Sequence, residues 1–359
     1  MNLRGLWKGK GAGFRGTLLF ICGILLGGCR VGYVVKAGYY QLELLSLREP
    51  LLEARINGGL SRQGLEAIRT VERTRDLAAR MGFSTAAIYT SVVVDWEREL
   101  WNVSACDPLS FEPKVWWFPV VGVVPYLGFF SIEEASREEE SLRNEGWDVH
   151  RSRVGAYSTL GWFDDPILPG MLRWPEVALR NLVFHELAHA TIWFPGSVQF
   201  NESFANFVAE KATLQTLAGK AGESTEAYHH ALEAFSDERQ WRQVLWKLFK
   251  DLEVVYQDGD RSESDKMRAK ESLFLGLETR LNSASFSRPQ RYRKRARSSQ
   301  WNNARLLQFR RYNSSYAWFE AVYQRAPGDF PQFFHEIKTI VDDSKRPFEA
   351  LKMAASEGP

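Results

Sequence analysis

Cysteine is scarce in this sequence, which has three Cys among 359 residues. So few thiols exclude a small domain stapled by a framework of disulfides. An excess of charge is missing as well: 46 Lys and Arg face 44 Asp and Glu, and the net charge of +2 argues neither for nor against a polyanionic partner. No internal repeat is visible. With 45% hydrophobic residues, 13 Trp and 23 Phe, the chain has the material for a well-filled core or an aromatic-lined cleft.

Acidic residues are absent from the first 15 positions, which carry four Lys or Arg. An apolar run follows from Thr17, and "LGGC" ends at Cys29. Basic, apolar and small residues in this order are typical of a secretory signal, and the last four resemble a bacterial lipobox. We therefore expect residues 1–28 to be a lipoprotein signal peptide and Cys29 to carry lipid. The alternative is an uncleaved anchor helix, but the run of about 12 residues is short for a span of roughly 20.

This signal predicts a protein of the bacterial cell envelope, lipid-anchored and facing the periplasm. The membrane is then one partner, through the N-terminal lipid. Cys22 would be removed and Cys29 acylated, so that Cys106 alone remains as a thiol. The mature chain could form no internal disulfide and must be held by its core or by a metal.

The mature chain, residues 29–359, predicts one α+β peptidase domain in three parts. Residues 29–110 have helical spacing of Leu from Tyr39 to Ile56 and again to Gly82. Residues 111–170 contain the β-branched and aromatic stretch 114–130, which predicts two or three short strands, then a charged helix that Ser131 caps, and a further strand that ends near Gly161. Residues 171–359 have mainly helical patterns. A small sheet thus precedes a helical half.

Four polar groups stand in an apolar segment at the junction of these parts. His185, Glu186 and His189 form an HExxH motif, whose two His lie four residues apart and so share one face of a helix. Both imidazoles could bind one zinc ion, and Glu186 could take a proton from zinc-bound water. Two harmless His on a surface helix are the alternative, but the apolar neighbours argue against it. Pro175 is suited to the first turn of this helix.

Catalytic zinc usually has three protein ligands and one open position. "FNESFANF" offers Glu202, after a turn that contains Pro195 and Gly196. We expect Asn201 to cap a second helix and Glu202 to lie in its first turn. Glu210, two turns further along, is the rival third ligand.

The motif and the downstream Asn201–Glu202 pair resemble the gluzincin pattern of thermolysin-like proteases and zinc aminopeptidases. "GWFDDPILPGMLRW", "FHELAHA", "FNESFANFVAEK" and "WNNARLLQFRRY" together are similar to the predicted aminopeptidase family of proteobacterial lipoproteins. This resemblance spans most of the mature chain and implies a zincin-like fold with the motif helix at the junction. It implies zinc as the cofactor and a peptide as the substrate. The segment between His189 and Glu202 is shorter than in thermolysin, so the connecting elements must be trimmed.

The resemblance also implies supporting residues. Asn206 matches the position that holds a metal-bound His through a hydrogen bond, with an exposed helix Asn as the alternative. Tyr312 is the candidate donor to the oxyanion, and Tyr316 is its rival. Residues Tyr157 to Trp162, with Gly161 among them, match the edge strand that pairs with the substrate backbone.

Three other features invite simpler interpretations. Asp164 and Asp165 could anchor a substrate amine, but a turn with Pro166 is the interpretation we prefer. Asn302 and Asn303 are expected to cap a helix. The tract from Arg288 to Arg297 has six basic residues and could touch lipid phosphates, but a solvated loop is the default expectation; no nucleic-acid partner is expected.

The sequence therefore predicts a lipid-anchored zinc peptidase, with an aminopeptidase as the first hypothesis. An envelope endopeptidase is the nearest alternative. A non-catalytic scaffold with a residual zinc site is an alternative of a different class.

Overall fold

The computed structural model describes residues 31–84, 87–96, 98–118, 122–155, 165–218, 225–297, 301–310, 316–341, 344 and 346–356. The chain divides into two units, residues 1–47 and 48–359. In the first unit the described element is helix α2 (Val31–Ser46). No helix of the described ranges is both long and apolar enough to cross a bilayer. Cys29, the predicted lipidation site, lies outside these ranges.

The helix predicted from Tyr39 to Ile56 is interrupted. Helix α2 ends at Ser46, strand β1 (Glu49–Pro50) follows, and helix α3 (Leu51–Asn57) begins after Pro50. Proline has no N–H for a preceding helical turn, which explains the break. The next helix, α4 (Arg62–Arg80), agrees with the prediction, and the Ser61 hydroxyl accepts a hydrogen bond from the Gly64 N–H at its start.

Three strands form the main sheet. Strands β3 (Trp101–Cys106), β6 (Leu127–Phe129) and β7 (Asp148–Arg153) are antiparallel, with β3 in the middle. Strands β4 (Trp116–Phe118) and β5 (Gly122–Val124) form a separate ribbon, while β2 (Ser91–Val92) pairs with β1. The short strands expected within residues 114–130 are thus confirmed. The sheet begins earlier than predicted, however, because β3 lies inside the range 29–110 that was assigned to helices.

Helix α5 (Ile132–Asn144) confirms the charged helix, and the Ser131 hydroxyl accepts from the Glu134 N–H as predicted. After a short 3₁₀ turn, η1 (Met171–Arg173), the chain is helical in every described element. These elements are α6 (Glu176–Thr191), α7 (Val198–Leu217), α8 (Glu226–Gln257), α9 (Glu263–Leu275), α10 (Leu277–Arg280), the 3₁₀ turn η3 (Leu281–Ser283), α11 (Pro289–Arg297), α12 (Asn303–Arg310), α13 (Tyr316–Tyr323), α14 (Phe330–Val341) and α15 (Pro347–Ser356).

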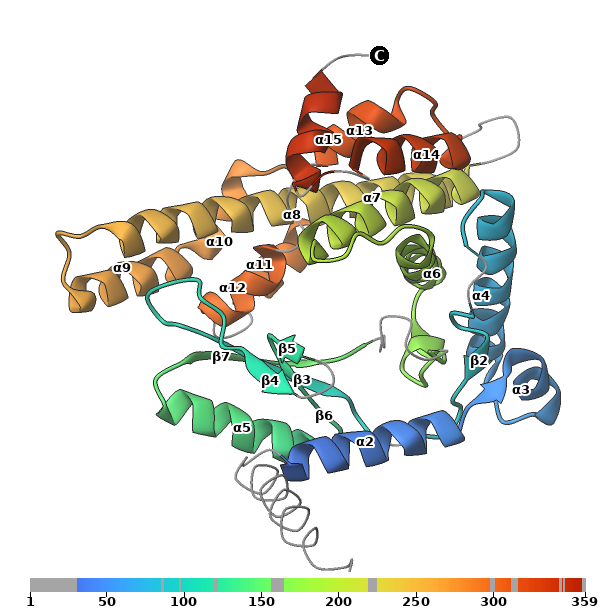
Figure 1. Cartoon of the computed structure of the whole chain (residues 1–359), viewed down its shortest axis with the longest axis horizontal. Helices are drawn as coiled ribbons and strands as arrows, with labels where there is room; N and C mark the ends of the chain where they lie inside the picture. Colours follow the sequence, from blue (N-terminus) through green and yellow to red (C-terminus); the bar gives the residue numbers. More distant parts are fainter. Residues whose placement is uncertain are drawn as a thin grey trace, which may run out of the picture. The chain divides into compact units, whose positions relative to one another are not determined.

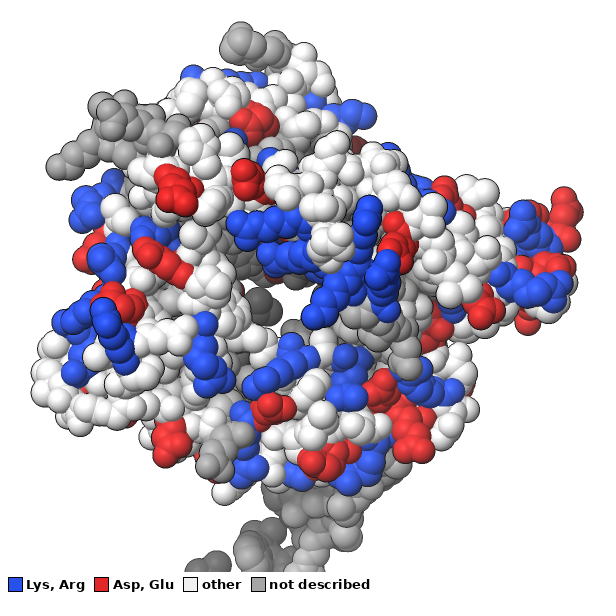
Figure 2. Space-filling model, turned by 180° about the vertical axis from the view of Figure 1, so that it is seen from behind, with Lys and Arg blue, Asp and Glu red and all other residues white. Residues whose placement is uncertain are grey.

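Helices α8 and α9 form a long hairpin (Figure 1). The tip of this hairpin carries basic and acidic side chains next to one another (Figure 2). Arg261 pairs with Asp258 at 2.9 Å, and Arg268 pairs with Asp265. Charges interspersed in this way neutralise one another in a solvated surface.

Aromatic side chains fill two cores in the second unit. One joins α7, α13 and α14, where Phe204, Phe207, Phe319 and Phe333 are at most 1% exposed. The other surrounds Trp241 of α8 and includes residues of α10, α11 and α12. Helix α7 packs in the first core, and α6 packs against α7. These two helices contain the candidate site.

The basic tract 288–297 is not a solvated loop. It forms α11, whose Tyr292 and Ala296 are buried in the Trp241 core. Arg295 pairs with Glu238 at 2.9 Å, and Arg297 pairs with Glu278 at 2.6 Å. Tyr292 and Ala296 lie four residues apart, so one face of the helix can be buried. Arg295 and Arg297 at the same time form ion pairs with carboxylates.

Candidate metal centre

Helix α6 places His185, Glu186 and His189 on one turn next to the first core. The helix begins after Pro175, and Leu179, Val183 and Leu187 are at most 1% exposed along its inner face. Both α4 and α7 pack against it. Since the two His are four residues apart, they emerge one above the other from the same face.

A tight turn joins α6 to α7. Gly196 has a φ of +79°, a conformation that favours glycine. Asn201 closes the turn: its side-chain amide accepts from the Phe194 N–H at 2.9 Å and donates to the Phe194 carbonyl at 2.8 Å. The expectation that Asn201 caps the helix was wrong, because α7 begins at Val198 with Ser197 at the N-cap. Asn201 instead satisfies both backbone groups of one turn residue.

This turn brings Glu202 over the two His. The Nε2 atoms of His185 and His189 are 3.1 Å apart, and the Glu202 carboxylate oxygens lie 3.6 Å from each. Two donors bound to one zinc ion at 2.0–2.2 Å with tetrahedral angles would be separated by about 3.3–3.6 Å. One nitrogen of each imidazole and the carboxylate therefore fit the donor set of a single ion. These are the three predicted ligands, and within the described residues they form the group with metal-ligand spacing.

Burial and charge set the protonation of the two His. Burial lowers the pKa of His189 to about 4, and the neighbouring His185 adds to this effect while Glu202 opposes it. At His185 burial also acts to lower the pKa, but the hydrogen bond to Glu202 and the charges of Glu186 and Glu202 outweigh it and raise the pKa. His189 is thus neutral at pH 7, as a metal ligand must be.

The other ring nitrogen of His189 has no partner. Nδ1 of His189 is buried without a hydrogen bond. Asn206, predicted to accept such a bond, donates its side-chain N–H to the Glu202 carbonyl oxygen at 2.7 Å. Asn206 therefore hydrogen-bonds to the backbone of Glu202, a predicted ligand. The predicted hydrogen bond between Asn206 and a His ring is not present.

Two aromatic residues at the site carry no sequence signal. The Trp193 ring lies edge-on to His189 with centroids 5.5 Å apart, and 41% of this residue is exposed. Tyr89 is fully buried with a φ of +55°, a strained conformation for a bulky residue. Burial and the charges of Glu186 and Asp165 raise the pKa of Tyr89, so Tyr89 stays neutral beside the motif helix. Only the three-dimensional structure brings Tyr89 to α6, because 97 residues separate it from Glu186.

Glu210, the rival third ligand, is committed elsewhere. Arg239 of α8 forms an ion pair with it, and the Tyr316 hydroxyl donates to it at 2.8 Å. Tyr316, the rival oxyanion donor, is therefore bonded to a carboxylate in α7. Together these contacts join α7, α8 and α13 two helical turns away from Glu202.

Several predicted residues lie outside the described ranges. These are Tyr157, Gly161, Trp162, Asp164 and Tyr312. Asp165 is described and is 5% exposed, and its backbone carbonyl accepts from the Tyr89 N–H at 3.1 Å. Asn302 caps α12 as expected, through its side-chain oxygen and the Arg305 N–H at 3.0 Å. Asn303 is fully buried, and its side chain donates to three backbone carbonyls of residues 107–110.

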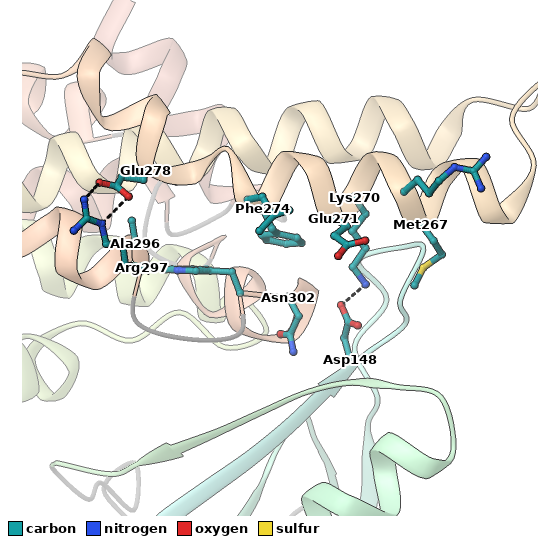
Figure 3. A pocket seen from close by; sticks show the side chains of 12 residues that line it. Asp148, Met267, Lys270, Glu271, Phe274, Glu278, Ala296, Arg297 and Asn302 are labelled. Carbon is teal, nitrogen blue, oxygen red and sulfur yellow. Dashed lines mark hydrogen bonds and ion pairs between the residues drawn. The ribbon is translucent and has the colours of Figure 1, made fainter.

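A cavity of about 600 Å³ lies away from this site, between β7, α9 and α11. Its wall holds an ion pair between Lys270 and Asp148 at 2.6 Å and another between Arg297 and Glu278 (Figure 3). Lys270 is 6% exposed, and Asp148 also accepts from the Asn303 N–H at 2.8 Å. Four of the charged residues in this wall thus form two ion pairs of opposite sign, whereas the predicted ligands of α6 and α7 bring three metal-ligand groups together.

A family model described as putative aminopeptidase matches residues 32–350, nearly the whole chain. The searches of curated proteins and of solved structures found no match to this chain. The matched range contains α6 and α7 with all three donors of the candidate metal centre.

Proposed function

The chain belongs to the putative aminopeptidase family, and from this premise we propose that it is a zinc-dependent peptidase that removes N-terminal residues from peptides. The observation that carries the proposal is the meeting of His185, His189 and Glu202, with their donor atoms 3.1–3.6 Å apart. A family of peptidases implies a peptide substrate and hydrolysis. The zinc and its role come from the donor set.

The residues present fit a zinc ion in number, type and spacing. Zinc, when bound, supplies a Lewis acid that makes hydroxide accessible at neutral pH. His189 would contribute a neutral nitrogen, His185 would give up its proton to bind the metal, and Glu202 would contribute one negative charge. Glu186 follows His185 directly on the same helix, is half-buried, and its charge acts to raise the pKa of His185. This proximity supports its proposed role as the group that accepts a proton.

Glu186 separates chemistry from metal binding, because it is not one of the three donors. Glu186→Gln should keep the zinc and the fold but remove the proton acceptor, and the rate should fall by about 10²–10⁴-fold. The measurement pairs zinc content per chain with hydrolysis of peptides that have free or blocked N-termini. Wild-type activity in Glu186→Gln would refute the role of this carboxylate as the base.

The substrate panel also decides between the related functions. Cleavage restricted to free N-termini is expected for an aminopeptidase, whereas cleavage of blocked peptides would favour the endopeptidase. A protein that holds zinc but cleaves neither class would favour the scaffold.

We further propose that the chain is anchored to the cell envelope through Cys29. The basic segment, the apolar run and "LGGC" support this part of the proposal. Cys29→Ser should leave a longer, unacylated precursor, which mass spectrometry of the membrane fraction can detect. A wild-type chain that keeps Met1 and carries no acyl group would establish the uncleaved anchor instead.

A further inference from the structure

The ribbon of β4 and β5 exposes apolar side chains where a solvated ribbon would expose polar ones. Trp116 and Phe118 point inward and are 5% and 6% exposed, while Trp117 between them is 69% exposed. Val123 lies directly opposite Trp117 in the other strand and is 61% exposed. Cross-strand partners share one face of a ribbon, so Trp117 and Val123 form a continuous apolar surface.

The surface continues beyond the two strands. Val115, two residues before Trp117, is 52% exposed, and Tyr126 after β5 is 43% exposed. We call Val115, Trp117 and Val123 the ribbon face, and the exposed Tyr126 follows in the bend after β5. Sheets with one solvated side normally alternate apolar and polar residues, and this ribbon instead is apolar on both sides. Exposed apolar patches of this kind mark surfaces that bind a partner or a membrane.

Charge is missing from the whole segment. No Asp, Glu, Lys or Arg occurs from Val115 to Phe130. Lys114 is the cationic residue that directly precedes this segment in the sequence. It pairs with Glu145 at 3.0 Å and lies over the Trp147 ring, so its contacts are at the base of the ribbon. The base is fixed to the main sheet, because the Lys114 N–H donates to the Ala105 carbonyl at 2.9 Å. The ribbon face is therefore an uncharged apolar surface on a firmly attached support.

Two features favour a lipid bilayer over a protein as the partner. Protein interfaces usually surround an apolar centre with a polar rim, and the segment 115–130 contributes no charged residue to such a rim. A bilayer requires no such groups, and charges would oppose insertion. Trp and Tyr, with an apolar body and a polar tip, are the residues that prefer the boundary between lipid and water.

The chain before Val31 brings the bilayer within reach. Its basic segment, apolar run and Cys29 attach the protein to a membrane whether Cys29 is acylated or the apolar run is kept. A tethered protein meets the membrane at a high effective concentration, so a small apolar surface suffices for a second contact.

From this combination we infer that the ribbon face docks on the lipid bilayer, inserting Trp117 and Val123 among the lipids as a second membrane contact. The inference rests on the anchoring part of the proposed function and is independent of the metal chemistry. The proposed partner of the exposed side of β4 and β5 is therefore phospholipid.

The test uses the full-length chain reconstituted in vesicles of phosphatidylethanolamine and phosphatidylglycerol with brominated acyl chains. Bromine quenches the fluorescence of Trp side chains that reach the acyl region. Trp117→Phe should lose most of the bromine-dependent quenching while it stays bound to the vesicles, because Phe keeps the surface apolar and removes only the fluorophore. Trp246→Phe on α8 is the matched control and should quench as wild type.

Replacement of the surface itself gives the second measurement. The variant Val115→Thr, Trp117→Ser, Val123→Thr should be removed from vesicles by detergent or salt washing about tenfold more readily, given the usual transfer free energy of such side chains. Leu275→Ser, which changes an equally exposed apolar residue on α9, should not differ from wild type.

Each alternative gives a distinct result. Trp117→Phe with unchanged quenching, on vesicles to which the chain floats, would overturn the docking of this face. If the wild-type chain is a dimer and the triple variant is a monomer, the ribbon face binds a second copy of the chain. If the triple variant has a raised KM for peptides, the ribbon face binds the substrate. Both would overturn the inference. A wild-type chain that does not float with vesicles would instead disprove the anchor. Zinc content should be unaffected in all cases.

Discussion

Two clusters of buried ionisable groups stand in contrast in this molecule. In the wall of the cavity under α9, Lys270 and Asp148 neutralise each other at 2.6 Å. At α6 and α7, two imidazole nitrogens face each other at 3.1 Å with a carboxylate 3.6 Å from both. The first cluster is complete by itself. The second brings two imidazoles and a carboxylate together with the spacing of ligands to one metal ion.

This contrast separates a structural cluster from a site that binds a ligand. Buried charges are tolerated where partners of opposite sign compensate them, as in the cavity wall. Imidazole and carboxylate groups that converge on one point are instead suited to bind a metal cation. The cavity of about 600 Å³ therefore does not coincide with the predicted chemistry, and the pairing of charges is more informative here than the volume of a cavity.

The largest expected effect concerns the second cluster. His189→Ala removes one of three donors, and zinc affinity should fall by more than about 10³-fold, since each bond contributes a large share of the binding free energy of about 10–16 kcal/mol. Zinc content after dialysis against a chelator gives the measurement. Full zinc retention in this variant would exclude His189 as a ligand.

Removal of one charged side chain from the first cluster should lower the stability of the fold and leave zinc binding unchanged. Lys270→Met leaves the half-buried Asp148 without its cation and should cost about 2–4 kcal/mol of unfolding free energy. The double variant Asp148→Asn, Lys270→Met should recover a large part of this loss, since no charge is then left unpaired. Urea unfolding measures both, and unchanged zinc stoichiometry would confirm that the clusters are independent. A loss of zinc in Lys270→Met would break the distinction between them.

The smallest effect is a dependence of stability on pH at His150 of β7. Burial, aided by the charge of Arg305 and opposed by Glu139, lowers the pKa of His150 to about 4, below the usual 6.5. The unfolded chain therefore binds a proton between pH 6.5 and about 4 that the folded chain does not, and stability is lost as the pH falls through this window. The contribution should be about 1–3 kcal/mol.

His150→Gln should flatten this part of the pH profile in urea unfolding, with or without zinc. His189 has its pKa lowered to a similar value, but a bound metal should govern its protonation. A pH profile at His150 that changes on zinc addition would contradict the separation of the two regions.

Prediction from the sequence succeeded where a local pattern carries the information. The Ser131 cap, helix α4 and the strands of residues 114–130 follow from side-chain periodicity and capping chemistry. The spacing of His185 and His189 places both on one helical face, and the turn residues Pro195 and Gly196 bring the chain back to Glu202. These features depend on neighbours in the sequence.

Prediction failed where contacts outside the local pattern decide. Asn201 is a residue typical of helix caps, yet it hydrogen-bonds to Phe194, seven residues earlier, and lies within α7. The basic tract became a helix because the Trp241 core accepts Tyr292 and Ala296, and Glu238 and Glu278 accept two of its Arg. Tyr89 comes to the motif helix from a segment 97 residues away. No periodicity within a segment reports such partners.

The short turn between α6 and α7 has a consequence for the order of folding. All three donors lie between His185 and Glu202, so a single helical hairpin contains the whole set. Closing so short a loop costs little chain entropy, and contacts local in sequence form early. A zinc ion could thus be captured by the nascent hairpin before α8 and the later helices are complete, and would then act as a nucleus on which the Phe-rich core assembles.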